Sequence, residues 1–265
     1  YGVFREIHVN ADIAIAQWQY YLASGDDAWL KQHGWPVIRE IAQFWVSRVT
    51  YNKTQDRYEI EHVTSPDEAY DDVPNDSFTN AAARKSLQIA IKAAKLVGAA
   101  PDPQWAAIAA KMYIPFDQKN QRHLDFDASV PHDKITWMGS SLAWLMYPNL
   151  DLPMSPQVRR NDFAFQLHEL KVHGDDPNEM MMVMLAVGAA ELGDNKAAGD
   201  WIQRNLVGFL KPPFNVRTET VANNAGYILA TSAGFVQSFV YGLSGLRIED
   251  DGLAEAYAPV LPPGW

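Results

Sequence analysis

The chain contains no cysteine, and this absence limits the chemistry it can perform. With no Cys among 265 residues, disulfides and thiolate catalysis are excluded, and any metal site would have to be built from His and carboxylates. The seven His are scattered without HExxH-like spacing, and neither a G-x-S-x-G motif nor a phosphate-cradling glycine loop occurs. We therefore expect no metal and no cofactor, and carboxylates are the main candidates for chemistry.

Positive charge and long apolar runs are also scarce. Lys and Arg number 22 against 32 Asp and Glu, giving a net charge of −10 and a pI near 5.1, which argues against a nucleic-acid partner. No apolar run approaches the roughly 18–20 residues that a membrane helix needs, so no membrane segment is expected. What the chain does have is 48% hydrophobic residues, enough for a substantial globular core.

Apolar residues recur at helical spacing along most of the chain. Several of the expected helices are apolar on more than one side, which predicts an all-α, two-layer arrangement with an inner ring of helices covered by an outer ring. Pro36 is expected to kink or split the second helix near its start. We expect a β-hairpin around residues 50–63, and short strands at 246–249 and 257–260. The expected helices cover residues 3–23, 27–48, 79–97, 103–111, 136–147, 155–170, 179–191, 196–210 and 222–243.

The stretch VTSPDEAYDDVPNDSFTN, residues 63–80, holds five acids within ten residues. One interpretation is a solvated loop that caps the next helix, with Thr79 and Asn80 as cap candidates. The other is a functional loop, because such residues often sit on loops between rigid elements. Asp67 and Glu68 are adjacent, so we expect one to be tied to backbone donors while the other faces a cleft. The remaining acids, Asp71, Asp72 and Asp76, fit loop and capping charges.

Two other stretches contain candidate carboxylates. Glu219 lies in NVRTE, between two threonines and just before an expected inner helix, where it could serve either as a helix N-terminal charge or in chemistry. Glu6 and His8 lie near the start of the chain at i,i+2 and cannot share a helix face. If the helix begins only near Asp12, both would lie in an extended lead-in and could reach a cleft.

Over nearly its whole length the chain resembles glycoside hydrolase family 65, which comprises glucosidases, acid trehalases and disaccharide phosphorylases. The segments that carry the resemblance are EIHVNADIAIA, SPDEAYDDVPNDSFTN, LPMSPQVRRNDF, NVRTE and PVLPPGW. It implies an (α/α)6 barrel, of which residues 1–250 would form about two-thirds. Residues 251–265 would lead toward a C-terminal β-domain absent from this chain.

The resemblance also implies roles for individual residues. Glu68 matches the general acid of the family's PDE motif, and Glu219 matches the general base of an NVWTE-like segment in the hydrolases. Asp67 would then support the loop. Weaker candidates for sugar contacts or loop support are Glu6, His8, Asn80 and Trp137. The expected activity is inverting hydrolysis of a small α-glucoside that is kojibiose-, trehalose- or glucosyl-galactose-like.

Two alternatives remain open. A phosphorylase of the family would carry a His/Ser-rich phosphate loop, which residues 212–224 lack. A non-catalytic sugar-binding relative is conceivable because Met138-Gly139 replaces the family's usual Lys-Gln pair in the sugar site, where Trp137 could fill the wall. We expect the partners to be a glycoside and the missing N-terminal part of the same enzyme, as a companion fragment or chain. The compartment stays open, with a secreted or periplasmic location favoured over a cytoplasmic one.

Overall fold

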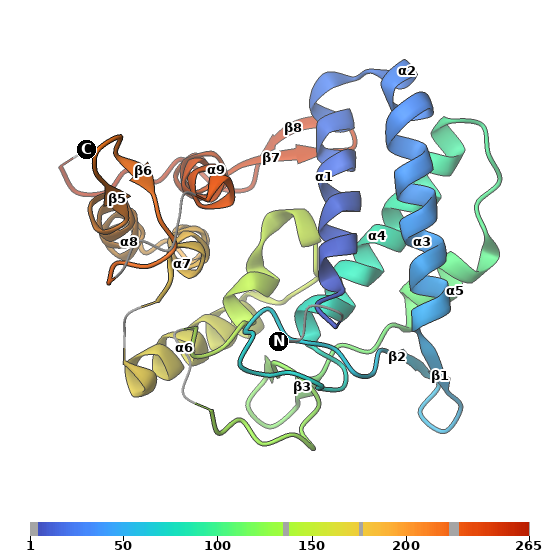
Figure 1. Cartoon of the computed structure of the whole chain (residues 1–265), viewed down its shortest axis with the longest axis horizontal. Helices are drawn as coiled ribbons and strands as arrows, with labels where there is room; N and C mark the ends of the chain where they lie inside the picture. The colour runs from blue at the N-terminus through green and yellow to red at the C-terminus, as the bar shows by residue number, and fades with distance from the viewer. Residues whose placement is uncertain (1–4, 135–137, 175–176, 223–227, 265) are drawn as a thin grey trace. The chain divides into compact units, whose positions relative to one another are not determined.

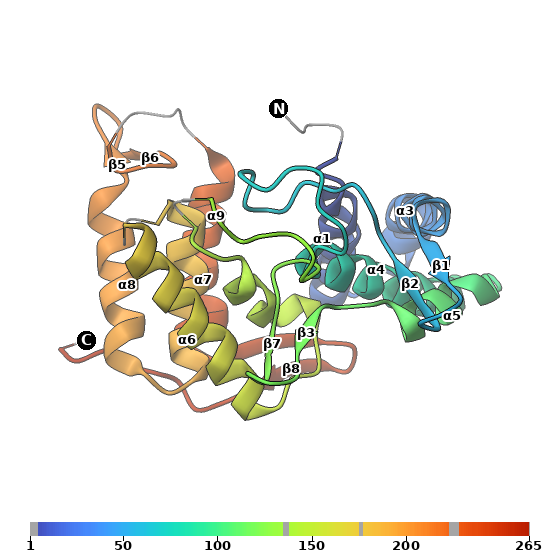
Figure 2. The ribbon, with the colours of Figure 1, turned by 90° about the horizontal axis from the view of Figure 1, so that it is seen from below.

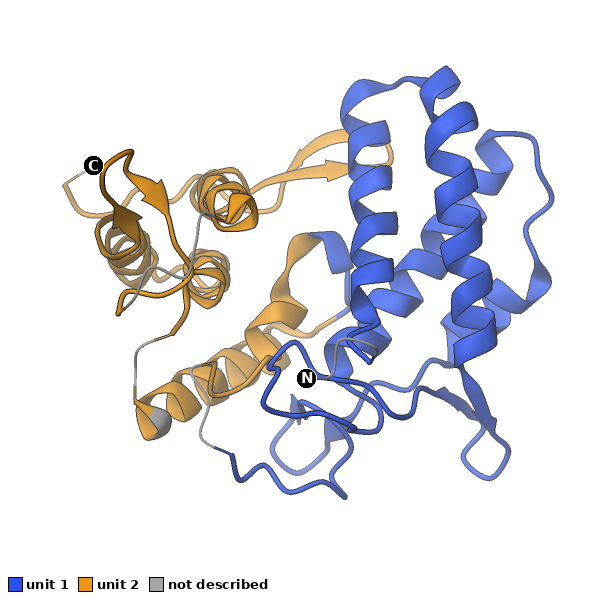
Figure 3. Ribbon diagram, in the orientation of Figure 1, with its two compact units in different colours: residues 1–134, 149–153 blue, residues 135–148, 154–265 orange. Residues whose placement is uncertain are grey.

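A computed structural model describes residues 5–134, 138–174, 177–222 and 228–264 of the chain. The described part is mostly helical with short two-stranded hairpins (Figure 1). It divides into two compact units (Figure 3), unit 1 with residues 1–134 and 149–153 and unit 2 with residues 135–148 and 154–265. Within the described residues, no helix combines the length and apolar character required to cross a membrane.

Unit 1 is organised around a long central helix. This helix, α4, packs against α1, α3 and α5, and Figures 1 and 2 show α1 and α3 beside it. At helical spacing α1 buries Ala11, Ile15 and Trp18. The helices of the unit are α1 (His8–Ser24), α2 (Asp27–Trp29), α3 (Trp35–Arg48), α4 (Ser77–Leu96) and α5 (Pro103–Lys111).

The helix predicted over residues 27–48 is split near its start, as Pro36 suggested. A π-helical turn, η1 (Leu30–Gly34), separates α2 from α3. Pro36 follows this turn closely, near the start of α3. The wider π-helical turn therefore coincides with the position where the proline removes a backbone N–H from the helical stretch.

Two hairpins extend from unit 1. The predicted one pairs β1 (Thr50–Asn52) with β2 (Arg57–Glu59). A second pairs β3 (Phe116–Asp117) with β4 (Arg122–His123). Its turn is held by Asp117, whose carboxylate accepts the N–H groups of Lys119 and Asn120 at 2.9 and 3.1 Å.

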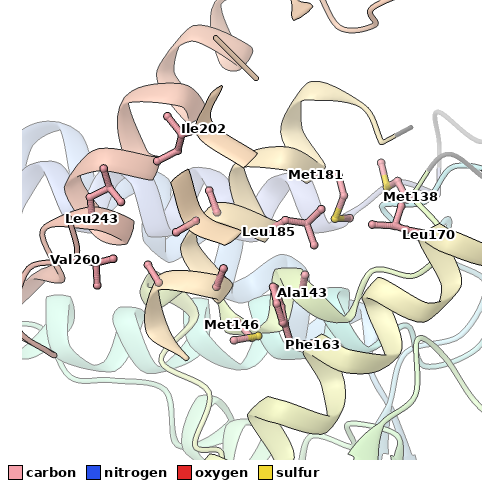
Figure 4. Close-up of a cluster of buried hydrophobic side chains, with 14 residues drawn as sticks. Met138, Ala143, Met146, Phe163, Leu170, Met181, Leu185, Ile202, Leu243 and Val260 are labelled. Atoms are coloured by element: carbon pink, nitrogen blue, oxygen red, sulfur yellow. The ribbon is translucent and has the colours of Figure 1, made fainter. Parts of the chain in front are cut away.

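Unit 2 is built around α7, which packs against α8 and α9. Because α7 is apolar on nearly every side, it supplies Met181, Leu185 and Ala189 to a buried cluster (Figure 4). The other elements are the 3₁₀ helix η2 (Leu142–Met146), α6 (Pro156–His173), α7 (Glu179–Glu191), α8 (Asn195–Gly208), α9 (Leu229–Gln237), the π-helical turn η4 (Ser238–Leu243), and hairpins β5 (Leu210–Lys211) with β6 (Val216–Arg217) and β7 (Leu246–Glu249) with β8 (Gly252–Glu255).

Side-chain caps define where most of these helices begin. At each cap a side-chain oxygen accepts a backbone N–H of the first turn, which satisfies a donor that the helix itself cannot. The prediction that Thr79 or Asn80 caps α4 is wrong, because both lie inside the helix and the N–H of Thr79 donates to Asp76. The capping residues are Asp26, Asp76, Asp102, Ser155, Asn178 and Asp194.

Three predicted elements of unit 2 differ from the structure. Of the helix predicted over 136–147, the described residues 138–147 form a turn at Gly139 followed by the short 3₁₀ helix η2 instead of an α-helix. The inner helix expected from residue 222 begins at Leu229 and ends in the π-helical turn η4. The strand expected at 257–260 is wrong, because β7 pairs with β8 instead, and Tyr257 donates its hydroxyl to the carbonyls of Tyr241 and Gly242 at 2.8 and 2.7 Å.

Candidate active site

The acidic loop, defined here as residues 63–76 of unit 1, is folded back on itself by backbone hydrogen bonds. Val63 and Val73 exchange both of their N–H to carbonyl bonds, at 3.0 and 2.9 Å. Further along, the N–H of Ser65 donates to the carbonyl of Tyr70, and the N–H of Tyr70 donates to the carbonyl of Asp67. The two ends of the loop are therefore joined by backbone hydrogen bonds, and its interior is held by further ones.

Asp67 and Glu68 face different environments, as their adjacency predicts. The side chain of Asp67 is only 2% exposed. Its carboxylate accepts the N–H of Ala69 at 3.4 Å, and its own N–H donates to the hydroxyl of Ser65 at 3.3 Å. Glu68, by contrast, is exposed. Of these two acids, only Glu68 has its side chain exposed at the surface.

The acids that follow are engaged within the loop. Asp71 accepts the Thr64 hydroxyl at 2.7 Å, and this bond, followed by the charge of Arg5, lowers the pKa of Asp71. Asp72 is 3.1 Å from the Arg5 guanidinium and 2.7 Å from Nδ1 of His62. Since Asp71 and Asp72 are exposed and paired with neighbouring side chains, they are loop charges, as predicted.

Tyr70 anchors the middle of the acidic loop. Its hydroxyl accepts the N–H of Lys134 at 2.9 Å, its ring stacks on that of His132 with centroids 4.9 Å apart, and Nζ of Lys134 donates to the carbonyl of Ala69. Nε2 of His132 in turn lies 3.2 Å from the carboxylate of Asp125. The loop that carries Glu68 thus rests on a packed aromatic support.

The segment before α1 lies against the acidic loop. The carbonyl of Arg5 accepts the N–H of Thr64 at 3.0 Å, and the pKa of Glu6 is raised by partial burial and then by the negative charge of Glu68. Glu6 is thus electrostatically coupled to Glu68. Among the weaker candidates, Glu6 is the one whose ionisation is affected by the charge of Glu68.

His8 and Asn80 are buried inside unit 1. His8 already belongs to α1, so the extended lead-in up to Asp12 is wrong for this residue. It is 6% exposed, packs edge-on against Phe78 with centroids 5.6 Å apart, and burial lowers its pKa to about 4. Asn80 has no exposed surface and donates to the carbonyl of Tyr113 at 2.6 Å. These contacts favour support of the fold over contact with sugar.

Glu219 lies in unit 2, two residues after the end of β6. The N–H of the preceding Thr218 donates to the carbonyl of Phe209 at 3.0 Å, and the carbonyl of Glu219 accepts the N–H of Glu179 at 3.2 Å. Because α9 begins only at Leu229, the interpretation of Glu219 as the N-terminal charge of that helix is wrong. Its side chain is partly exposed.

Met138 and Gly139, which replace the family's Lys-Gln pair, are part of the packed interior of unit 2. Met138 is 4% exposed and belongs to the buried cluster. Gly139 has φ +67, and a Cβ there would lie 2.7 Å from the backbone nitrogen of Leu170, so no side chain fits. Trp137, the candidate to fill the sugar-site wall, lies outside the described residues. No group of three or more His, Asp or Glu within the described ranges could hold a metal ion.

Comparison with known proteins identifies the family. The model for the glycosyl hydrolase family 65 central catalytic domain matches residues 2–147, and the chain belongs to this family. It is 36% identical to a protein-glucosylgalactosylhydroxylysine glucosidase of Danio rerio over 97% of the chain, and 32% identical to a kojibiose hydrolase of Flavobacterium johnsoniae over 100% of it. It spans 38% and 37% of the lengths of these two relatives.

More distant relatives include a periplasmic acid trehalase of Saccharomyces cerevisiae, which is 27% identical over 91% of the chain. The fold is similar to that of a solved structure from the human microbiome that is provisionally named a kojibiose phosphorylase. The TM-score is 0.67 at 17% identity, over 92% of this chain and 38% of that one. The helical (α/α)-barrel type of fold expected from the sequence is thereby confirmed. The domain boundary at residue 250 stays a prediction.

Proposed function

We propose that the complete protein carrying this chain is an inverting α-glycoside hydrolase acting on a small α-glucoside. The observation that carries the proposal is the division within the acidic loop, where Asp67 is buried and Glu68 is exposed. The relatives are named for action on kojibiose, trehalose or the glucosylgalactosyl unit of hydroxylysine. These names favour a small α-glucoside as the substrate.

In the proposed reaction Glu68 and Glu219 have complementary tasks. Glu68, in its protonated form, gives its proton to the glycosidic oxygen as the bond to the anomeric carbon breaks. Glu219, as a carboxylate, takes a proton from the water that attacks the same carbon from the opposite face. One water is consumed and an α-glucoside yields β-glucose. Inverting enzymes hold the two carboxyls roughly 6.5–9.5 Å apart to leave room for that water.

Hydrolysis is favoured over phosphorolysis by the sequence around Glu219. A phosphate anion would have to bind next to the carboxylate that the family's hydrolases use as a base, and like charges at close range repel. The segment also lacks the His/Ser-rich loop with which the family's phosphorylases hold phosphate. A phosphorylase of the same family is the second candidate, and the phosphorylase with the same fold supports keeping it.

The role of each carboxyl is tested by Glu68→Gln and Glu219→Gln in the complete protein. We expect each change to lower kcat about 10²–10⁴-fold, the usual contribution of a positioned acid or base. Asp72→Asn is the matched control, because it removes an exposed charge from the same loop, and it should retain the wild-type rate. Hydrolysis that persists at the wild-type rate in Glu219→Gln would overturn the assignment of the base.

The type of reaction is tested with kojibiose, trehalose, nigerose and maltose, each with and without phosphate. We expect phosphate-independent release of glucose, with the β-anomer appearing first when products are followed by NMR. Initial α-glucose would contradict inversion, and phosphate-dependent formation of β-glucose 1-phosphate would establish the phosphorylase. Sugar binding in calorimetry without turnover would support a non-catalytic protein.

For the compartment we propose a secreted or periplasmic location. The support comes from two yeast relatives, which are named as periplasmic or secreted acid trehalases. Fractionation of the native cells, with the protein detected by antibody, tests this proposal. Recovery only with the cytoplasmic fraction would contradict it.

A further inference from the structure

A buried ionic cluster lies next to Glu219 in unit 2. It consists of Glu179, Asn205 and Arg217, and we call it the Glu179 cluster. Oε1 of Glu179 accepts Nε and Nη2 of Arg217 at 3.3 and 3.2 Å and Nδ2 of Asn205 at 3.2 Å. Nη2 of Arg217 also donates to the carbonyl of Asn205 at 2.8 Å and to its side-chain oxygen. The carboxylate of Glu179 is completely buried and Arg217 is 6% exposed.

The cluster joins four elements that are distant in sequence. Glu179 is the first residue of α7, Asn205 belongs to α8 and Arg217 ends β6. The guanidinium of Arg217 also lies over the ring of Phe235 in α9, 4.2 Å from its centroid. The planar fork of arginine can serve several acceptors at once while its face rests on an aromatic ring.

Glu219 is connected to this cluster through a short length of backbone. Its carbonyl accepts the N–H of Glu179 at 3.2 Å, so Glu179 holds Arg217 with its side chain and Glu219 with its main chain. Thr218, which lies between Arg217 and Glu219 in the sequence, donates its N–H to the carbonyl of Phe209. Three successive residues of the segment are therefore fixed, and the Glu219 side chain retains mainly its own rotations.

Stability alone is a weak reason for a buried ion pair. The free energy lost when two charges are removed from water offsets much of the free energy gained from their attraction. Proteins in which such a pair is replaced by apolar side chains of similar volume are often equally stable. In this cluster Oε2 of Glu179 lacks a hydrogen-bond partner among the described residues, which adds to the cost. What the pair supplies that apolar packing would not is a directional hold on the backbone at residues 217–219.

We propose that Glu179 and Arg217 are positioning residues for Glu219, and that they fix the end of β6 so that the carboxylate is presented to the attacking water in one place. The inference rests on the proposed role of Glu219 as the base. Both side chains are buried, so each would act only through the segment that it holds.

The test compares two buried glutamates at opposite ends of α7. Glu191 is also nearly buried and also pairs with arginines, namely Arg247 at 2.6 Å and Arg159, but it is not bonded to the segment of Glu219. We expect Glu179→Gln to lower kcat about 10–100-fold with KM nearly unchanged, since a misplacement of about 1 Å can cost 10²-fold. Glu191→Gln should keep both constants, although it too removes one buried charge from an ion pair.

A combined variant separates positioning from loss of fold. In a Glu219→Gln background, Glu179→Gln should have no further effect on kcat, because the group that it positions is already gone. Arg217→Lys is the second variant, since it keeps the charge but loses the fork, and it should lower kcat in the same way. Tm and circular dichroism of each variant show whether the fold is retained.

The outcomes distinguish the inference from the proposed function. If Glu219→Gln is as active as the wild type, the proposed base is wrong. If Glu219→Gln is inactive while folded Glu179→Gln or Arg217→Lys has wild-type kcat, the positioning role is overturned and the function stands. Equal losses of kcat in Glu179→Gln and Glu191→Gln would also overturn it, because destabilisation of α7 would then explain both.

Discussion

The carboxyl of Asp76 is subject to two opposing effects on its pKa, because the hydrogen bonds of the helix cap lower it and burial raises it. Its Oδ1 accepts the N–H and the hydroxyl of Thr79, each at 2.7 Å, while the side chain has no exposed surface. Burial raises its pKa to about 7, and the bonds from Thr79 and Ser65 only partly offset this. The sequence predicts only a helix-capping charge, and the raised pKa follows from the complete burial of the side chain in the structure.

We predict that Asp76→Asn flattens the dependence of stability on pH. Between pH 4 and 7 the folded wild type holds a proton that the unfolded chain has released, so its stability falls as pH rises, by up to about 1.4 kcal/mol per pH unit for one group. Asn caps equally well and does not titrate. The advantage of the variant should therefore be near zero at pH 4 and grow toward pH 7, measured as the difference in free energy of unfolding.

The comparison must be between variants because other groups titrate in the same range. His8 acts in the opposite direction: burial lowers its pKa to about 4, so stability is lost as pH falls from about 6.5 toward 4. Asp102→Asn, the same change at the partly exposed cap of α5, controls for the cap chemistry itself. Parallel stability curves for wild type and Asp76→Asn would contradict the prediction.

At the scale of elements, the turn before η2 depends on Gly139. We predict that Gly139→Ala destabilises the protein by about 2–5 kcal/mol, from left-handed backbone strain plus overlap with the backbone of α6. Gly193 is the matched control, because it also has positive φ but a Cβ there would contact nothing within 4 Å. Gly193→Ala should cost only about 1–2 kcal/mol. Equal losses in denaturant unfolding would show that the contact with α6 is unimportant.

Elements whose signals are local could be predicted from the sequence. The bounds of α7 agree with the prediction because an apolar run of helical length is preceded by Asn178, which caps it, and is followed by Gly193. The first hairpin is likewise signalled by its own turn, where Asn52 accepts the N–H groups of Thr54 and Gln55. In both cases the deciding contacts lie within a few residues.

Elements decided by distant contacts could not be predicted in this way. The apolar residues of η2 resemble a helix, but Gly139 packs against α6 some thirty residues later, and the carbonyl of Met138 accepts the amide of Gln166. The pairing of Glu179 with Arg217 crosses 38 positions. No spacing rule within a helix or strand connects residues so far apart.

At the scale of the whole molecule, charge is the property that the sequence determines most directly. With 22 basic and 32 acidic residues, the chain should be repelled by polyanions at neutral pH. We predict that it passes through a heparin column at pH 7 and low salt, and that an anion exchanger retains it. Retention on heparin at physiological salt would reveal a local basic site that the net charge conceals.

The candidate site could be identified only by combining the family resemblance with the structure. No local rule separates Glu68 from Asp71 or Asp72, since all three are acids in one loop. The resemblance singles out Glu68 and Glu219, and the coordinates add that Asp67 is buried whereas Glu68 is exposed. Their catalytic roles stay predictions.

The contrast between Asp67 and Glu68 has a consequence for how natural variants of this protein would be tolerated. A change at Asp67 removes a buried acceptor and should reduce the amount of folded protein that a cell accumulates. A change at Glu68 alters an exposed side chain and should leave that amount intact while each molecule turns over less substrate. Two neighbouring positions would thus be under selection for different reasons, one for abundance and the other for turnover.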